Sequence, residues 1–348
     1  METPPGESGS GARRASPAGQ LRLPLKEEKG MEANLKRILL AFAVLAVLLP
    51  IAIAQAEPVQ EFSFQLKDVR PDGRFTVVFT SRTFDTTGGI PPILRQNLLR
   101  LPVGAKINKT FLRSKYYCDG AKLLATLQEN PQSSVKFYTR VENLNPLIKT
   151  LKKSKLASDR KKLANVKTCK SVLIGRGTVQ VDARPFINEL IPAKIYLFFG
   201  KPTQPGAVAS FSILGVPDEN AAVVRNTPVV RDTRVALSAN FFNDPTPDGK
   251  FGYKLVLPTG AIQGINISVA EVNVTTKGLT LTKKKVTCLK RKKGKCRKKK
   301  VKRTNVFWFT APTCPASGKI DFEAFYGYDP PQPNITKDIQ LSCPKFSR

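Results

Sequence analysis

The stretch that decides the fold reads AKIYLFFGKPTQPGAVASFSIL and covers residues 193–214. Two runs rich in Val, Ile, Phe and Tyr, residues 193–199 and 207–214, flank a segment that contains Pro and Gly. Apolar, β-branched and aromatic runs that are bounded by turn residues are typical of β-strands. This stretch therefore predicts two consecutive strands joined by a short loop.

Similar runs recur along most of the chain. They predict further strands at residues 61–69, 74–80, 178–183, 229–242, 251–257, 265–275, 304–310, 319–326 and 338–343. Asp72-Gly73 and Asp248-Gly249 are typical hairpin turns between such runs. More than ten short strands at this spacing predict a mainly β fold, arranged as a β-sandwich or jelly roll.

A possible internal duplication offers an alternative architecture. Residues 71–75, residues 101–105 and Cys118 recur in the same order as residues 247–251, residues 257–261 and Cys288. The matches are short and their spacings differ, so similar turns explain them nearly as well. Two tandem β-sandwich modules are therefore the alternative to one domain.

Residues 119–170 differ from the strand-rich parts. Asp119 is a typical helix N-cap before the apolar residues of 121–127, and Asp159 could cap a later basic helix. Residues 146–156 place Leu147, Ile148 and Leu151 on one helical face among lysines. We expect a mainly helical insertion here that packs its leucines on the sheet.

The N-terminal region has the pattern of a secretory signal. Lys36 and Arg37 precede an apolar run at 38–49, and Ala54-Gln55-Ala56 resembles a cleavage site. A start at Met31 would give a signal peptide over 31–56 and leave 1–30 as a mis-assigned gene start, which would be disordered if translated. Alternatively, residues 38–56 form an uncleaved transmembrane anchor. Both alternatives place residues 57–348 outside the cell.

All six cysteines follow the expected cleavage site, and their even number in an exported chain favours disulfides. Six cysteines allow fifteen connectivities. Pairing between neighbours in sequence predicts Cys118 with Cys169, Cys288 with Cys296, and Cys314 with Cys343.

Composition restricts the available chemistry. The chain has no histidine, which excludes Ser-His and Cys-His nucleophiles and His-ligated zinc. Its formal net charge is +31. We assign no catalytic residue, metal ligand or cofactor, and an exported, non-enzymatic protein is the leading expectation.

Residues 283–303 form a basic segment, expected to be a loop, with fourteen Lys and Arg residues and no acid. Such a charge attracts polyanions by counterion release, although it could also be a solvated loop without a partner. Aromatic residues are missing from the segment, so no specific nucleic acid is expected. The candidate polyanion-binding residues are Lys283, Lys284, Lys285, Lys290, Arg291, Lys292, Lys293, Lys295, Arg297, Lys298, Lys299, Lys300, Lys302 and Arg303.

Three weaker candidate sites have ordinary structural explanations. Asp321 and Glu323 would share one face of a strand, as two-carboxylate hydrolysis requires, but apolar residues alternate with them as in a half-buried strand. Asp244 and Asp248 could bind calcium, but the two prolines near them favour a plain turn. Trp308 could stack on a sugar, whereas a lone Trp inside a strand normally packs in a core.

Several short motifs together resemble an uncharacterised family of secreted, β-rich actinobacterial proteins. These motifs are Leu101-Pro102-x-Gly104, Cys118, Lys167-Thr168-Cys169-Lys170, Ile174-Gly175-Arg176-Gly177-Thr178, Phe198-Phe199-Gly200, Phe251-Gly252-Tyr253 and Cys314-Pro315-Ala316-Ser317-Gly318. The resemblance implies an exported sandwich-type fold of unknown activity and carries no site residues.

Three functions are compatible with these observations. The first is adhesion to anionic cell-envelope polymers or membrane surfaces through the basic segment. The second is a carbohydrate-active hydrolase or lyase that uses carboxylates. The third is a purely structural surface protein.

Overall fold

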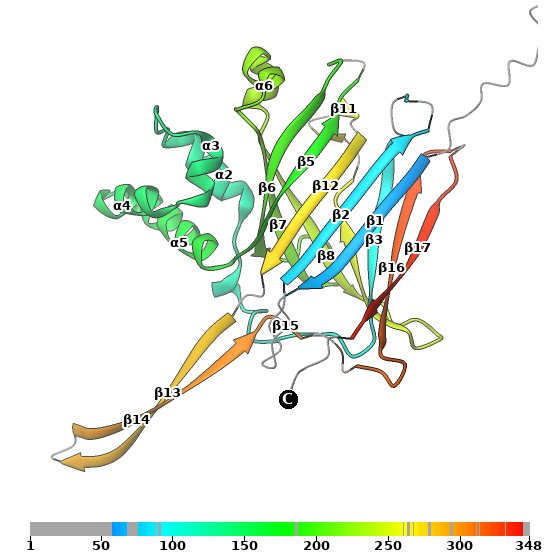
Figure 1. The fold of residues 1–348 in the computed structure, drawn as a ribbon. Helices are drawn as coiled ribbons and strands as arrows, with labels where there is room; N and C mark the ends of the chain where they lie inside the picture. The colour runs from blue at the N-terminus through cyan, green and yellow to red at the C-terminus, as the bar shows by residue number, and fades with distance from the viewer. Residues whose placement is uncertain are drawn as a thin grey trace, which may run out of the picture. The chain divides into compact units, whose positions relative to one another are not determined.

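The computed structural model describes residues 58–67, 76–86, 88–89, 92–184, 187–259, 261–262, 265–266, 268–277, 280–292, 295–310, 312, 314–330 and 332–343. The expected signal or anchor and the Asp72-Gly73 turn lie outside these residues. The fold is mainly β, as predicted, and is dominated by one eleven-stranded sheet (Figure 1). Its strands are β1 (Pro58–Lys67), β2 (Thr76–Asp85), β3 (Leu94–Pro102), β5 (Leu173–Asp182), β6 (Leu190–Gly200), β7 (Ala207–Pro217), β8 (Val235–Asn243), β9 (Phe251–Leu257), β12 (Ser268–Lys277), β16 (Lys319–Tyr328) and β17 (Ile335–Ser342).

The strands of this sheet pair in the order β1-β2-β12-β5-β6-β7-β8-β9-β3-β16-β17, and every pair is antiparallel. Strand β12 lies between β2 and β5, and β3 lies between β9 and β16. Strands from the two halves of the chain are therefore interleaved. These eleven strands form one continuous sheet, which differs from the two tandem modules considered as an alternative.

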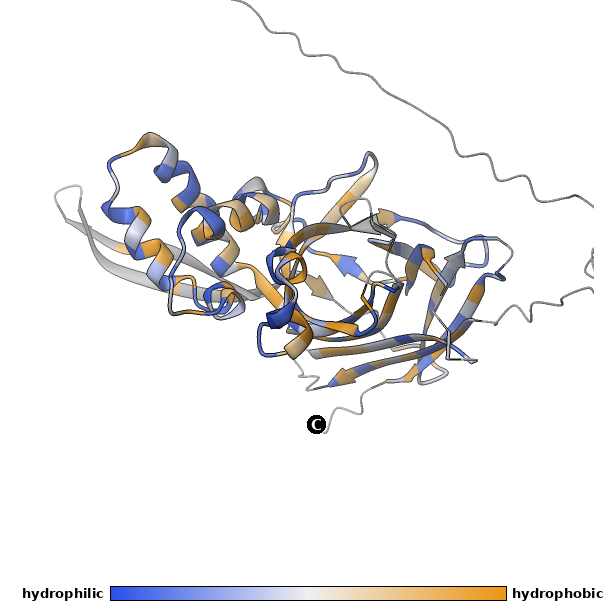
Figure 2. Ribbon diagram, turned by 90° about the horizontal axis from the view of Figure 1, so that it is seen from above, coloured by the Kyte–Doolittle hydropathy of each residue, from blue (hydrophilic) through white to orange (hydrophobic). Residues whose placement is uncertain are grey.

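The sheet curls, as the view from above shows (Figure 2), and its two edge strands, β1 and β17, contact each other. Aromatic rings link β1 to β16, with Phe62 6.3 Å from Tyr326 and Phe64 4.7 Å from Phe322 between ring centroids. Phe62 also lies 5.0 Å from Phe79 of the neighbouring strand β2. Offset and edge-to-face aromatic pairs at such distances stabilise beyond their burial. The two layers expected of a sandwich are thus opposite walls of one sheet.

Strands β6 and β7 carry apolar side chains on both faces, which accounts for the uninterrupted apolar runs at 193–199 and 207–214. Tyr196 and Leu214 are fully buried on the outer face, where the helices pack. Ile195 and Ile213 point to the interior of the curled sheet. Because one face packs against the helices and the other faces an apolar interior, these strands do not show the alternation of polar and apolar residues of a strand with one face in water.

Two strand predictions need correction. Residues 229–232 were expected to begin a long strand, but they belong to helix α7 (Pro228–Asp232), which follows α6 (Ala222–Asn226). Pro228 at the first turn favours a helix start because its fixed φ suits that position. Strand β3, with Arg95 and Gln96 exposed among its apolar residues, was not predicted.

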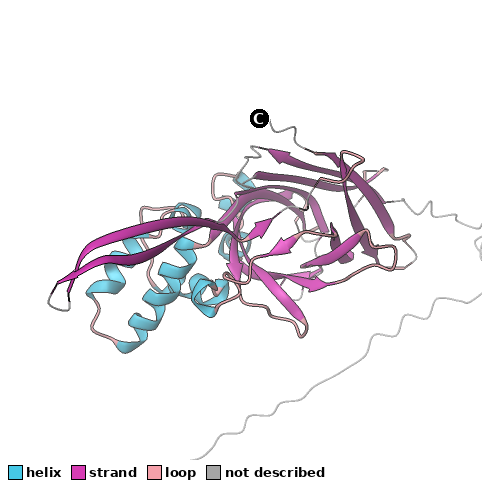
Figure 3. Ribbon diagram, turned by 90° about the horizontal axis from the view of Figure 1, so that it is seen from below, coloured by secondary structure: helices cyan, strands magenta, loops and turns pink. Residues whose placement is uncertain are grey.

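The predicted helical insertion is present and covers one side of the sheet (Figure 3). It contains the helices α2 (Gly120–Glu129), α3 (Phe137–Glu142), α4 (Asn145–Lys153) and α5 (Ala157–Ser171), and the 3-10 turn η1 (Ser114–Tyr116) precedes it. Asp119 caps α2 as predicted, since its carboxylate accepts the Lys122 N–H at 3.0 Å. Asp159 was expected to be a cap, but it lies inside the first turn of α5, whose N-cap is Leu156.

Helix α2 lies unusually close to β7. A Cβ added to Gly120 would lie 2.1 Å from the Ser212 hydroxyl oxygen, so a larger residue would require at least the Ser212 side chain to move. Leu123 and Leu127, which follow at helical spacing on the same helix, are fully buried. Their burial contributes about 2 kcal/mol for each side chain.

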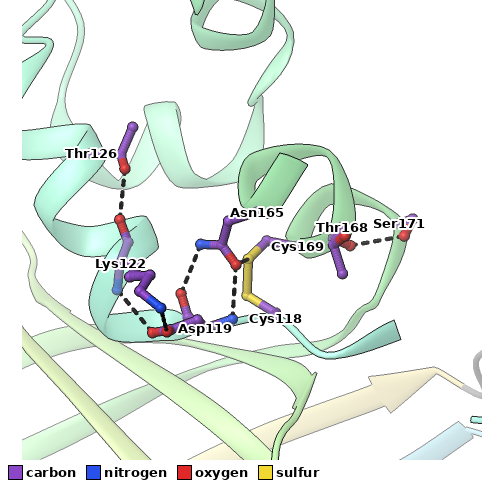
Figure 4. The surroundings of a disulfide bond; sticks show 8 residues. All are labelled: Cys118, Asp119, Lys122, Thr126, Asn165, Thr168, Cys169 and Ser171. Atoms are coloured by element: carbon purple, nitrogen blue, oxygen red, sulfur yellow. Dashed lines mark hydrogen bonds and ion pairs between the residues drawn. A yellow bond between two sulfur atoms is a disulfide. The ribbon is translucent and has the colours of Figure 1, made fainter. Parts of the chain in front are cut away.

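A disulfide between Cys118 and Cys169 joins the two ends of the helical insertion (Figure 4). Asn165 supports it by accepting the Asp119 N–H and donating to the Asp119 carbonyl, each at 3.0 Å. The Cys118 N–H donates to the Phe199 carbonyl at 2.9 Å. The insertion is therefore attached covalently to itself and by hydrogen bonding to β6.

A second disulfide joins Cys314 to Cys343 near the C-terminal end of the described chain. Cys314 is exposed, whereas Cys118 and Cys169 are fully buried. Two of the three predicted pairs are thus present. The predicted pair of Cys288 with Cys296 involves the Cys296 side chain, which lies outside the described part.

The basic segment is a hairpin of two strands instead of the loop that was expected. Strand β13 (Thr280–Lys292) pairs antiparallel with β14 (Lys295–Phe307), and this hairpin projects from the large sheet (Figures 1 and 3). Of the side chains in 283–303, those of 287–289 and 301 are described. Two shorter pairs also form, β4 (Lys106–Ile107) with β15 (Phe309–Thr310) and β10 (Ala261–Ile262) with β11 (Ile265–Asn266).

Candidate ligand-binding cavity

The curled sheet encloses a cavity of about 640 Å³. Because side chains alternate across a strand, every second residue of the surrounding strands points into it. Examples are Val179 on β5, Ile195 on β6, Ile213 on β7 and Val272 on β12. These four side chains remain half-exposed although they face the interior. The interior is therefore hollow instead of filled by interdigitating side chains.

The wall of the cavity is almost entirely apolar. Among the described residues that line it, none is Asp, Glu, Lys or Arg. This contrasts with a formal net charge of +31 for the chain. Cavities of 300–1,000 Å³ with apolar walls and a few polar groups are typical of sites for small ligands.

Trp308 closes one end of the cavity. Its ring centroid lies 5.3 Å from that of Phe211, 5.9 Å from Phe199 and 6.3 Å from Phe241, and only 9% of the residue is exposed. The Trp308 carbonyl accepts the Asn108 N–H at 2.7 Å, which fixes the segment between β14 and β15. Trp308 is thus a packed core residue, as expected, and also forms the floor of the cavity.

The opposite end reaches the surface beside α7. Val229 and Val230 of this helix both line the cavity. Val230 is buried, whereas Val229 is 71% exposed, so the cavity is open to solvent there. Thr227, Thr233 and Thr259 give this rim hydroxyl groups.

A polar cluster lies on the inner face of β1, β2 and β16. Gln60, which is 3% exposed, donates from Nε2 to the Ser81 hydroxyl at 2.7 Å. Its Oε1 accepts from the hydroxyls of Thr83 at 2.6 Å and Tyr328 at 2.9 Å. Ser81 and Thr83 also line the cavity. Burial raises the pKa of Tyr328 to about 12, so its hydroxyl stays neutral at physiological pH.

An ion pair between Asp182 and Arg184 lies at the end of β5. Arg184 Nε donates to both oxygens of Asp182 at 3.0 Å, and Arg184 Nη2 donates to the Gly89 carbonyl at 3.1 Å. The Asp182 side chain is fully buried, which alone would raise its pKa, but the hydrogen bonds from Arg184 outweigh burial and lower it. The pair thereby links the end of β5 to the segment that follows β2.

Replacement of Asp182 by Asn is expected to destabilise the protein by about 2 kcal/mol at pH 7, because it leaves the partly buried Arg184 without its counter-charge. The folded-state pKa of Asp182 is lowered, so its contribution is complete above about pH 4 and is lost as pH falls through the folded pKa. Urea unfolding of both proteins between pH 7 and pH 3 measures this. The difference in the free energy of unfolding between the wild type and the variant should shrink toward pH 3. An equal difference at both pH values would contradict a stabilising ion pair between Asp182 and Arg184.

The sequence-predicted carboxylate candidates lie away from the cavity. Asp321 and Glu323 alternate with the buried Ile320 and Phe322, which places the two carboxylates on the outer face of β16. Glu323 pairs with Arg100 at 2.6 Å. Neither carboxylate lines the cavity.

The candidate calcium site is occupied by ion pairs and turn contacts. Asp244 is 3.0 Å from Lys254 and 3.4 Å from Arg100, and Asp248 accepts the Lys250 N–H at 3.1 Å. Gly249 completes the β8–β9 turn with φ at +68°. Among the residues that the structure describes, no group of three or more His, Cys, Asp or Glu side chains is arranged to hold a metal ion.

Sequence reasoning did not find the cavity, nor the inward polar residues Gln60, Ser81 and Tyr328. Their signal would have been polar residues at inward positions of otherwise apolar strands. Within the described ranges, no helix has both the length and the apolar character needed to cross a membrane. Comparisons of the chain with protein-family models, curated proteins and solved structures each give no match.

Proposed function

We propose that this protein binds a long apolar molecule inside its curled sheet. The observation that carries the proposal is the open cavity of about 640 Å³ with no charged side chain on its described wall. A hollow apolar interior open to water is unfavourable when empty, because its side chains lose packing contacts. An apolar ligand would restore those contacts.

The expected affinity follows from the area that such a ligand removes from water. Each buried methylene contributes about 0.8 kcal/mol, so a chain of roughly twelve methylenes contributes about 10 kcal/mol. The loss of translational and conformational freedom on binding offsets part of this, by about 4 kcal/mol or more. The net gain of at most about 6 kcal/mol corresponds to a Kd of roughly 40 µM or weaker.

Titration with N-phenyl-1-naphthylamine, an uncharged fluorophore that brightens in apolar surroundings, tests the proposal. We expect a saturable increase in fluorescence with one probe bound per chain. Solvent extraction of protein purified without detergent, followed by mass spectrometry, should release a lipophilic compound in comparable molar amount. A strictly linear fluorescence response would overturn the proposal.

We further propose that the protein acts outside the cell. The signal pattern of residues 31–56 and the two disulfides support export. N-terminal sequencing of the protein from the medium and from membranes is the direct test. Glu57 as the first residue of soluble protein is expected, and intact chains in the membrane fraction would instead support the anchor alternative.

A second candidate function is binding to anionic envelope polymers through the β13–β14 hairpin. The backbone register places Lys284 opposite Arg303 and Lys285 opposite Lys302. Like charges in directly opposed positions of a hairpin repel each other, and a bound polyanion would relieve the repulsion. This pairing specifically favours polyanion binding over a solvated loop.

Deletion of residues 283–303 with a Gly-Ser turn in their place tests the second function. Affinity for polyphosphate, used as the model polyanion, should fall at least tenfold, and its dependence on salt should flatten because fewer counterions are released. Replacement of Leu289 and Val301, which are 55% and 50% exposed, by Ser is the matched control that keeps the charge. Unchanged affinity and salt dependence in the deletion variant would exclude this function.

A further inference from the structure

The turn between α4 and α5 forms the tip of an antiparallel helix pair. The Lys170 ammonium, near the end of α5, donates to the Asn145 side-chain carbonyl at the start of α4. The two helices therefore run in opposite directions, and residues 154–156 join them at the other end. Because an α-helix rises about 1.5 Å per residue, Leu156 lies about 20 Å along α5 from the disulfide at Cys169. We call residues 149–161 the helical tip.

The helical tip is strongly basic. It holds six Lys and Arg residues and one acid, Asp159, which lies 3.6 Å from Lys162 outside the tip. All six cations are exposed, and none makes an ion pair with another described residue. They are Lys149, Lys152, Lys153, Lys155, Arg160 and Lys161. Their positive potential is therefore available to an anionic partner.

Leu156 adds an apolar side chain to this basic surface. The residue is 64% exposed and occupies the N-cap position of α5, where its side chain makes no capping hydrogen bond. Ser, Thr, Asp and Asn stabilise an N-cap because their side chains accept a backbone N–H, whereas leucine has no such acceptor. Neither core packing nor helix capping accounts for leucine here. Contact with an apolar phase outside the protein would account for it.

The other leucines of this helix pair are already used by the core. Leu147 and Leu151 of α4 are buried and belong to the core cluster. Helix α4 is therefore not a surface helix that lies in the plane of a bilayer with its apolar face in the lipid. Only the helical tip combines an exposed apolar side chain with surrounding cations.

We propose that the helical tip docks the protein on an anionic lipid bilayer. Each Lys or Arg close to an anionic leaflet strengthens binding roughly fivefold, and burial of the Leu156 side chain at the acyl boundary adds roughly tenfold or more. Lysine suits this position because its methylene stem lies along the apolar boundary while its ammonium stays in water. A soluble polyanion offers charge without an apolar phase, so the exposed leucine favours a bilayer. This surface is separate from both the cavity and the β13–β14 hairpin.

Cosedimentation of protein from the soluble fraction with lipid vesicles tests the proposal. Replacement of Lys152, Lys153 and Lys155 by Gln should lower affinity for vesicles of equimolar phosphatidylglycerol and phosphatidylcholine at least twentyfold. The wild type should bind pure phosphatidylcholine vesicles only weakly. Its binding to the anionic vesicles should weaken as salt is added, because salt screens the attraction.

The matched control removes three positive charges elsewhere. Lys109, Lys201 and Lys337 are exposed, lie outside the helical insertion and make no ion pair with a described residue. Their replacement by Gln gives the same net charge and should lower vesicle affinity less than threefold. Equal losses in the two triple variants would overturn the proposal, because net charge alone would then govern binding.

Replacement of Leu156 by Ser separates a bilayer from a soluble polyanion. The variant keeps every charge and should weaken binding to the anionic vesicles about tenfold, while its affinity for polyphosphate stays unchanged. It should be at least as stable as the wild type, since serine is the better N-cap. Replacement of Val103, which is 58% exposed between β3 and β4, by Ser is the control and should change neither affinity. Unchanged vesicle binding by the Leu156 variant, or an equal loss for polyphosphate, would overturn the assignment of a bilayer.

Discussion

Simultaneous replacement of Ile213 and Val272 by Trp is expected to weaken binding of N-phenyl-1-naphthylamine at least tenfold. Both side chains point into the cavity from different parts of the sheet and are half-exposed there. Two indole rings would occupy space that the ligand needs and would fill a hollow without displacing packed neighbours. Because the two indole rings would bury apolar surface inside the ligand-free protein, its free energy of unfolding should be unchanged or increased. Probe titration and urea unfolding measure the two effects.

The matched control places the same two indole rings outside the cavity. Thr178 and Val256 alternate with the lining residues Val179 and Leu255, and so face outward on β5 and β9. Their replacement by Trp should leave probe affinity within twofold of the wild type. Equal loss of affinity in both double variants would contradict the placement of the ligand inside the sheet.

Removal of the Cys118–Cys169 disulfide by double Ser substitution is expected to lower the free energy of unfolding by about 4 kcal/mol. The bond spans 51 residues, and closing a loop of that length restricts the unfolded chain by an amount of this order. Both cysteines are fully buried, so the two hydroxyls add a desolvation cost. Urea unfolding with and without the substitutions measures the loss.

The Cys314–Cys343 bond provides the comparison. It spans 29 residues, for which the same entropy relation gives a loss of nearly the same size, about 3.6 kcal/mol. Its removal buries no new hydroxyl at Cys314, which is exposed. Only the Cys118–Cys169 bond joins the ends of the helical insertion. Its removal should therefore also lower the helical signal in circular dichroism, whereas removal of the Cys314–Cys343 bond should not. Retention of the helices after loss of Cys118–Cys169 would show that the bond does not hold the insertion in place.

Local features were predictable from sequence because they depend on neighbouring residues. The capping of α2 by Asp119, the strands at 193–199 and 207–214, and the turn at Gly249 all follow from short-range geometry. Long-range pairing was not predictable in the same way. Nothing in the residues of β12 specifies that this strand inserts between β2 and β5, since that choice depends on the whole sheet.

The cavity could not be predicted because a strand that faces a hollow has the same pattern as one that faces a packed layer. Ile195 and Ile213 would have the same sequence signature in a filled sandwich. The basic hairpin was expected to be a loop for another reason. Lysine has low β propensity and like charges repel across strands, so the sequence of 283–303 argues against the pairing that the backbone shows.

The most direct test of ligand binding inside the sheet uses Trp308, the only tryptophan in the chain and the floor of the cavity. Titration with 16-bromohexadecan-1-ol places a bromine, which quenches indole fluorescence on contact, at the end of the apolar chain. We expect saturable quenching with one ligand per protein and little quenching by 2-bromohexadecan-1-ol, whose bromine stays near the head group. Absence of quenching by both compounds, or weak quenching that grows linearly with concentration, would contradict the account.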